Sequence, residues 1–90
     1  MEQFRFVSLI LSQDYTPQAN QARFESPLCL SQIYGVGSLE EACRLAREIA
    51  DEGQIHRVEL CGAFGPEGAK AVAEAAGGRL SVGYVTDLAE

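Results

Sequence analysis

The spacing of apolar and polar residues divides the chain into alternating elements. Runs of branched and aromatic residues, bounded by glycine, proline or short polar residues, are typical of β-strands. Such runs predict four strands, at residues 3–11, 28–36, 55–61 and 80–86. Residues 12–27 are polar and lack a clear period, so we expect a long loop there, of the kind that serves as a functional lid or stays mobile.

The clearest helix lies between Ser38 and Gly53. Ser38 is a favourable N-cap, Glu41 three residues later completes a capping box, and Gly53 is a typical helix end. The apolar positions between them share one broad face, which predicts packing against a sheet. They are Leu39, Ala42, Cys43, Leu45, Ala46, Ile49 and Ala50.

A second helix is predicted from Pro66, which suits the first helical position, to the Gly77-Gly78 stop. Its small side chains allow a close approach to the sheet. The element order is therefore strand, strand, helix, strand, helix, strand. Its last five elements form two strand–helix–strand units, which require parallel strands. The fold prediction is an α/β domain with a four-stranded, mostly parallel sheet and two helices.

Length and charge narrow the classes of partner. Ninety residues form a single domain, residues 1–90, and a domain of this size buries only about 60–65% of its unfolded surface, so we expect a homo-oligomer. A net charge of −6 with seven basic residues argues against nucleic-acid binding. The apolar run from Phe6 to Leu11 is too short to span a membrane and lacks the features of a secretion signal. We expect a cytoplasmic protein without a membrane partner.

The cysteines indicate neither a disulfide framework nor a metal centre. Cys29, Cys43 and Cys61 are odd in number, and none forms a Cys-x-x-Cys pair. With a single histidine in the chain, we expect no metal site. Cys29 and Cys43 fall within regular strand and helix patterns, where cysteine is usually a small buried residue. Cys61 alone lies where chemistry is plausible.

A glycine-rich turn around Cys61 is the best candidate for a site. Residues 58–68 are predicted to run from a strand through this turn into a helix, where backbone amides converge and missing Cβ atoms leave room for a ligand. The turn has no Ser, Thr, Lys or Arg, so it matches neither a P-loop nor a dinucleotide fingerprint, and no cofactor is identified. The predicted ligand-binding residues are Glu59, Cys61, Gly62, Ala63, Phe64 and Gly65.

Alternation along the third strand separates two faces of the sheet. His56, Val58 and Leu60 are expected on an apolar face, whereas Glu59 and Cys61 point the other way. Ser8 and Gln32 are the expected polar neighbours of this second face. It is shielded by the long loop, buried in an oligomer, or shaped as a ligand site.

The residues Glu59 to Gly68, followed by Val82-Gly83-Tyr84-Val85-Thr86-Asp87, resemble a family of bacterial proteins of about a hundred residues whose function is unassigned. The resemblance covers roughly the last fifty residues. It differs at Ala63, where relatives carry glycine. It implies a shared fold and a shared turn, and it brings no activity with it.

Several roles of the turn residues stay open. Glu59 is either a general base, with Arg57, Tyr34 or Tyr84 orienting a substrate, or the partner of Arg5 or another arginine in a salt bridge. Cys61 is a nucleophile or a buried structural thiol.

Phe64 is either a flap over the site or a plug in the core. The function favoured by the sequence is binding of a small molecule at residues 59–68. The alternatives are a structural or protein-interaction module, or a small enzyme using Glu59 or Cys61.

Overall fold

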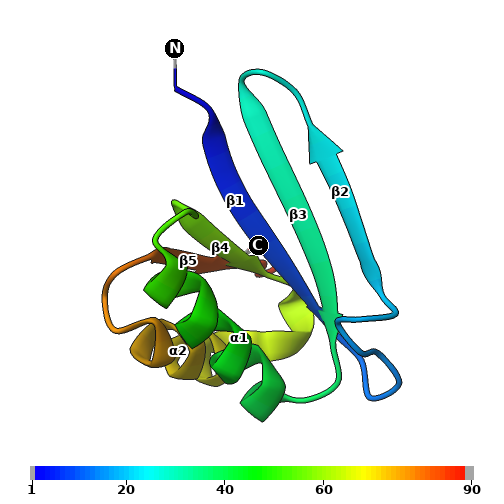
Figure 1. Cartoon of the computed structure of the whole chain (residues 1–90). Coiled ribbons are helices and arrows are strands. Elements are labelled where there is room, and N and C mark those ends of the chain that lie inside the picture. Colours follow the sequence, from blue (N-terminus) through cyan, green and yellow to red (C-terminus); the bar gives the residue numbers. More distant parts are fainter. Residues whose placement is uncertain (1, 89–90) are drawn as a thin grey trace.

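Two long strands form the centre of the molecule, β1 (Phe4–Leu11) and β3 (Cys29–Val36) (Figure 1). The computed structural model describes residues 2–88. Val7 and Leu9 of β1 are almost fully buried, whereas the next residue, Ile10, is partly exposed. The strand therefore presents two different faces.

β1 pairs in parallel with β3 on one side and with β4 (Arg57–Leu60) on the other. β4 pairs in parallel with β5 (Ser81–Tyr84), and the full strand order is β2-β3-β1-β4-β5. The predicted mostly parallel α/β sheet is confirmed for residues 2–88.

The prediction of four strands is wrong, because the expected loop 12–27 contains a fifth. β2 (Gln21–Glu25) pairs antiparallel with β3, which changes the predicted element order. All five of its residues are exposed, so the strand has no apolar face that a sequence pattern could reveal. Backbone pairing with β3 holds it in place, helped by the Gln32 amide, which donates to the carbonyl oxygen of Ala22 at 3.1 Å.

Local signals specified the helices well. α1 (Leu39–Glu52) begins after Ser38, whose hydroxyl accepts from the Glu41 amide at 3.1 Å, and ends at Gly53 in the left-handed conformation. The Glu41 carboxylate accepts in turn from the amide of Gly37, at 2.8 Å. A single 3₁₀ turn, η1 (Gly62–Phe64), leads into α2 (Gly65–Ala76), and Gly77 ends that helix.

Both helices lie on one side of the sheet, over β4, β5 and the neighbouring ends of β1 and β3 (Figure 1). The β2–β3 hairpin projects beyond them. Their small residues pack on Val7, Leu9, Val58 and Leu60 to form the core. We call the side that the helices cover the helix face and the opposite side the open face.

The register corrects two predicted side-chain positions. Gln32 is aligned with Val7 and is buried on the helix face, not beside Glu59 as expected. His56 precedes the regular part of β4, so strand alternation does not extend to it. Its ring stacks on Phe4, which projects from the open face, with ring centroids 5.5 Å apart. Ser8 is aligned with Glu59 on the open face, as predicted.

Candidate functional site

The predicted turn lies at a special point of the sheet. After β1 the chain passes through β2 to β3, which lies on one side of β1 in the sheet. It then crosses back through α1 to β4, which lies on the other side of β1. Ligands of open α/β sheets bind outside the carboxyl ends of the strands, where the strand order reverses in this way. The carboxyl ends of β1 and β4 are therefore the place where a crevice is expected, and Cys61 directly follows β4.

Cys61 joins the two strand ends. Its amide donates to the Leu9 carbonyl at 3.1 Å, and its sulfur accepts from the Leu11 amide at 3.4 Å. The side chain is half-buried, and it packs against the edge of the core. These contacts give the thiol a structural role in closing the ladder between β1 and β4.

Glu59 is partly exposed and paired. Its carboxylate lies 3.1 Å from the Arg57 guanidinium, which also donates to the Ser81 hydroxyl at 2.8 Å. The expected salt bridge is therefore present with Arg57 as the partner. Arg5 lies on the helix face and donates to the Gln54 carbonyl at 2.6 Å. Gly83 leaves the space for this arrangement, because a Cβ atom there would overlap the Arg57 guanidinium.

The four remaining turn residues divide into three environments. Phe64 is 7% exposed and belongs to the core cluster, so it is a plug and not a flap. Gly62 and Ala63 are exposed. Gly65 has φ +64°, a conformation that strongly favours glycine. Gly62 has no positive φ, so this conformational requirement for glycine applies to Gly65 and not to Gly62.

Two hollows flank the turn. One, of about 190 Å³, opens on the open face and is lined by Glu59, Cys61, Ser8 and Ile10 among others. The second, of about 320 Å³, is formed by Gly62, Gly65 and Pro66 together with the segment Tyr84–Asp87. Val85 contributes to both, and its amide donates to the Leu60 carbonyl at 3.0 Å. Four of the six predicted residues thus line the two hollows, whereas Ala63 lines neither and Phe64 is buried in the core.

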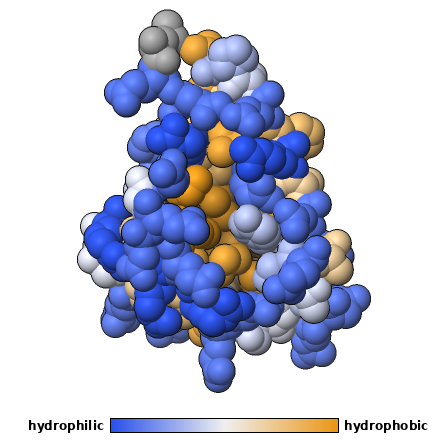
Figure 2. Space-filling view, viewed as in Figure 1, coloured by the Kyte–Doolittle hydropathy of each residue, from blue (hydrophilic) through white to orange (hydrophobic). Residues whose placement is uncertain are grey.

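A groove on the helix face was not predicted. It has a volume of about 380 Å³ and lies between the carboxyl-terminal end of α1 and the β2–β3 hairpin. Figure 2, viewed from the same side as Figure 1, shows a band of apolar side chains in a hollow bordered by polar ones. Val7, Leu30, Ile49 and Ile55 are its apolar lining residues, and Tyr34 also borders it.

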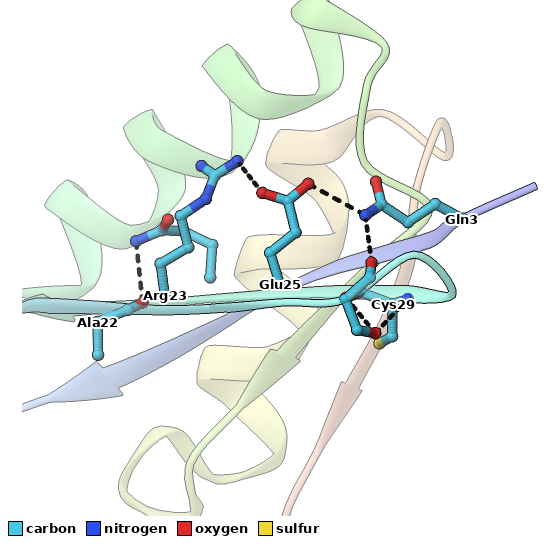
Figure 3. Close-up of polar contacts among 7 residues, drawn as sticks. Gln3, Ala22, Arg23, Glu25 and Cys29 are labelled. Atoms are coloured by element: carbon cyan, nitrogen blue, oxygen red, sulfur yellow. Dashed lines mark hydrogen bonds and ion pairs between the residues drawn. The ribbon is translucent and has the colours of Figure 1, made fainter.

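A polar network forms one wall of this groove (Figure 3). The Glu25 carboxylate accepts from Gln3 and from Arg23, each at 3.1 Å. The Gln3 amide and then the Arg23 guanidinium hold the pKa of Glu25 below its ordinary value. Gln3 also donates to the Ser26 carbonyl at 2.9 Å, which ties the start of β1 to the hairpin turn. Sequence reasoning missed this wall because it placed Arg23 and Glu25 in a loop.

Other titratable groups lie away from the turn. Burial raises the pKa of the Cys43 thiol on α1, with Arg47 opposing the shift. The Ser12 hydroxyl, 2.6 Å from Asp14, lowers the pKa of that exposed carboxyl. Within residues 2–88 no group of three His, Cys, Asp or Glu side chains is placed to hold a metal ion. In the same range, no helix is long and apolar enough to cross a membrane.

The chain belongs to the DUF6506 family of unknown function, whose sequence profile matches residues 4–90. Comparison with curated proteins and with solved structures gives no match. The family assignment extends over nearly the whole chain, including β2 and the hairpin.

Proposed function

We propose that this protein is a cytoplasmic homo-oligomer that binds a small molecule in the crevice beside residues 59–68. The observation that carries the proposal is the position of the turn, at the carboxyl ends of β1 and β4, where the strand order reverses. Three free cysteines agree with a reducing compartment.

The groups around the crevice set the kind of ligand. The hollow beside Gly62 and Gly65 has about 320 Å³, at the lower end of the range of about 300–1,000 Å³ for ligand sites. Backbone groups of the turn, the Thr86 hydroxyl and the Asp87 carboxylate supply its polar lining, with Pro66 and Val85 as apolar surface. A small polar metabolite with an apolar edge fits this lining better than an extended cofactor.

The helix-face groove is a second candidate for the same function. It is favoured by its volume of about 380 Å³ and by the apolar lining residues between polar walls. Against it, Arg23, Glu25 and Gln3 already pair with one another, so a ligand must compete with these bonds. We therefore rank the groove below the crevice.

Catalysis by Glu59 or Cys61 is the less favoured alternative. Glu59 is already paired with Arg57, so a substrate proton would have to compete with this ion pair for the carboxylate. Cys61 accepts a backbone hydrogen bond and has no cationic group among the residues that line its hollow. We expect iodoacetamide to label Cys61 no faster than an ordinary free thiol at neutral pH. Rapid stoichiometric labelling of Cys61 in the native protein would favour an enzyme over a binding domain.

The proposed site is tested by a thermal-shift screen with a set of defined metabolites, repeated on two variants. Thr86→Trp is designed to fill the crevice, and Arg23→Trp is designed to fill the groove. Both substitutions replace an exposed side chain with tryptophan. A compound that raises the melting temperature by mass action should lose its effect in Thr86→Trp and keep it in Arg23→Trp. Loss in Arg23→Trp alone would move the site to the groove. No hit in either background would favour the structural or protein-interaction module.

A further inference from the structure

The open face carries large apolar side chains that nothing in the described chain covers. Both helices lie on the other side of the sheet. Phe24, Phe4 and Ile10 are 67%, 45% and 39% exposed, and Phe6 stacks on Phe4 with ring centroids 5.8 Å apart. Large apolar side chains exposed on one face of a sheet are typical of an interaction site.

The strand register arranges this face in rows that run across the sheet. One row is Phe24, Ser31, Phe6, Arg57 and Ser81. The next row toward the carboxyl ends is Ala22, Ile33, Ser8, Glu59 and Gly83. On β1 and β2, Phe6 and Phe24 in the first row are matched by the smaller Ser8 and Ala22 in the second. On β3 the order is reversed, with the small Ser31 in the first row and Ile33 in the second. On β4, a positive charge in the first row is matched by a negative charge in the second.

We propose that a second copy of this chain packs on the open face, related by a two-fold axis that runs across the strands between these two rows. Such an axis exchanges the rows while keeping each strand opposite its own copy. Arg57 then faces the partner's Glu59, Phe24 faces the partner's Ala22, and Phe6 faces the partner's Ser8. Side-chain size on β1, β2 and β3 and charge on β4 are therefore complementary across this axis, as an isologous interface requires.

A hollow on the same face fits the exposed phenylalanines. It has about 340 Å³ and is lined by Tyr15 and Gly35 together with Ile10, Ala22 and Ile33. The two-fold axis places Phe4 and Phe24 of the partner subunit opposite this hollow, opposite Ile10 and Ala22 respectively. The packed loop around Tyr15 forms its wall, so the projecting rings of one copy enter the recess of the other.

The size of the face agrees with a dimer. With strands about 4.8 Å apart and a rise of about 3.3 Å per residue, the five strands cover roughly 450 Å² in plan. Two faces that cover each other in full bury about 900 Å² in plan, and side-chain relief adds to this value. That total is close to the threshold of about 1,000 Å² for specific interfaces. Sheets packed face to face about 10 Å apart, with strands within about 30° of each other, provide the geometry.

The dimer also changes the surroundings of the proposed small-molecule site. Only this part of the inference rests on the proposed function. The same axis carries the amino-terminal end of the partner's β4 over the carboxyl-terminal end of β4. Phe4 of the partner subunit then faces Ile10 and covers the shallow hollow lined by Glu59 and Cys61. His56 of the partner subunit lies at this end as well, although His56 and Cys61 of one chain are at opposite ends of the strand. The partner thereby closes the open-face side of the crevice.

The charge pair gives a sharp test by sedimentation velocity. In Arg57→Glu, the four charges at the interface all become negative, and in Glu59→Arg they all become positive. Each variant alone should dimerise at least about tenfold more weakly than the wild type, because like charges face each other. An equal mixture should regain dimers, since each chain now meets the opposite charge. Lys70→Glu and Glu74→Arg make the same charge changes on exposed positions of α2 and should leave dimerisation unchanged.

The outcomes separate the interface from the ligand site. A wild-type protein that stays monomeric at micromolar concentration, single variants that dimerise normally, or a mixture that stays monomeric would each overturn the proposed dimer. Circular dichroism melting curves of each variant establish that it is folded. Binding of a screened metabolite near Thr86, followed by amide chemical shifts in a monomeric variant, reports on the crevice alone. The small-molecule binding in the proposed function therefore fails only if that signal is absent in wild type and variant alike.

Discussion

Replacing Phe64 with alanine tests whether the turn is fixed by a core plug. The Phe64 ring is 7% exposed and packs within the main core cluster, beneath the exposed positions Gly62 and Ala63. Removing a buried phenylalanine side chain costs about 3–5 kcal/mol, from lost burial and from the cavity left behind. At about 0.05–0.15 kcal/mol per residue, a domain of this length has a total stability of about 5–13 kcal/mol. The substitution therefore removes a large part of the stability.

The effect is measurable by urea unfolding. The chain has no tryptophan, so far-UV circular dichroism is the suitable signal. With a denaturant slope of about 1–3 kcal/mol per molar urea, a loss of 3 kcal/mol lowers the midpoint by about 1–3 M. In a thermal scan, the same loss lowers the melting temperature by roughly 12 °C or more. Variants are compared at one protein concentration, because association shifts apparent stability.

Ala63→Ser is the matched control at the exposed neighbouring position. It should change the free energy of unfolding by less than about 0.5 kcal/mol. If Phe64→Ala stays within about 1 kcal/mol of the wild type with an unchanged slope, the ring is not a core plug. A ring that acts as a flap would instead leave stability intact and alter only ligand binding.

Three further outcomes follow from single residues. Gly65→Val should lower the free energy of unfolding by about 1–3 kcal/mol, because valine resists φ +64°. Gly62→Ala should be tolerated, since Gly62 has no positive φ. Equal melting temperatures for the two variants would refute this difference. Hydrogen bonds from Gln3 and then from Arg23 lower the pKa of Glu25, so they stabilise the fold above the unfolded-state pKa, and this contribution is lost as pH falls through the lower folded value. Glu25→Gln should therefore flatten the loss of stability on acidification. Cys43, whose pKa is raised, should react with iodoacetamide at pH about 8 more slowly than a free thiol of pKa about 8.5, as peptide mass mapping can measure.

Local signals in the sequence determined the helices and the central strands. Ser38 and Gly53 cap α1 as predicted, because a capping hydroxyl and a left-handed glycine act within one turn of the chain. The carboxyl-terminal stop of α2 at Gly77 was specified in the same way. Two successive strand–helix–strand units then required parallel strands, and the sheet has them.

Part of the candidate site followed from the sequence as well. The turn after Leu60 was located correctly, since its glycines and Pro66 are local markers of a strand-to-helix connection. The backbone conformation of the turn did not follow from these markers. Gly65 adopts a positive φ and Gly62 does not, a difference that the glycine content of the turn does not reveal.

The tertiary structure alone decided the rest. β2 has no buried residue, so its pairing with β3 left no pattern in the sequence, and the groove wall of Arg23 and Glu25 was missed with it. Gln32 lies among core residues because the register with Val7 sets its face, and a polar residue gives no sign of such a position. The alternation of apolar and polar residues indicates which face of a single strand is buried. Strand order, register and the location of an uncovered face arise from contacts between distant segments, and these contacts appear only once the sheet is assembled.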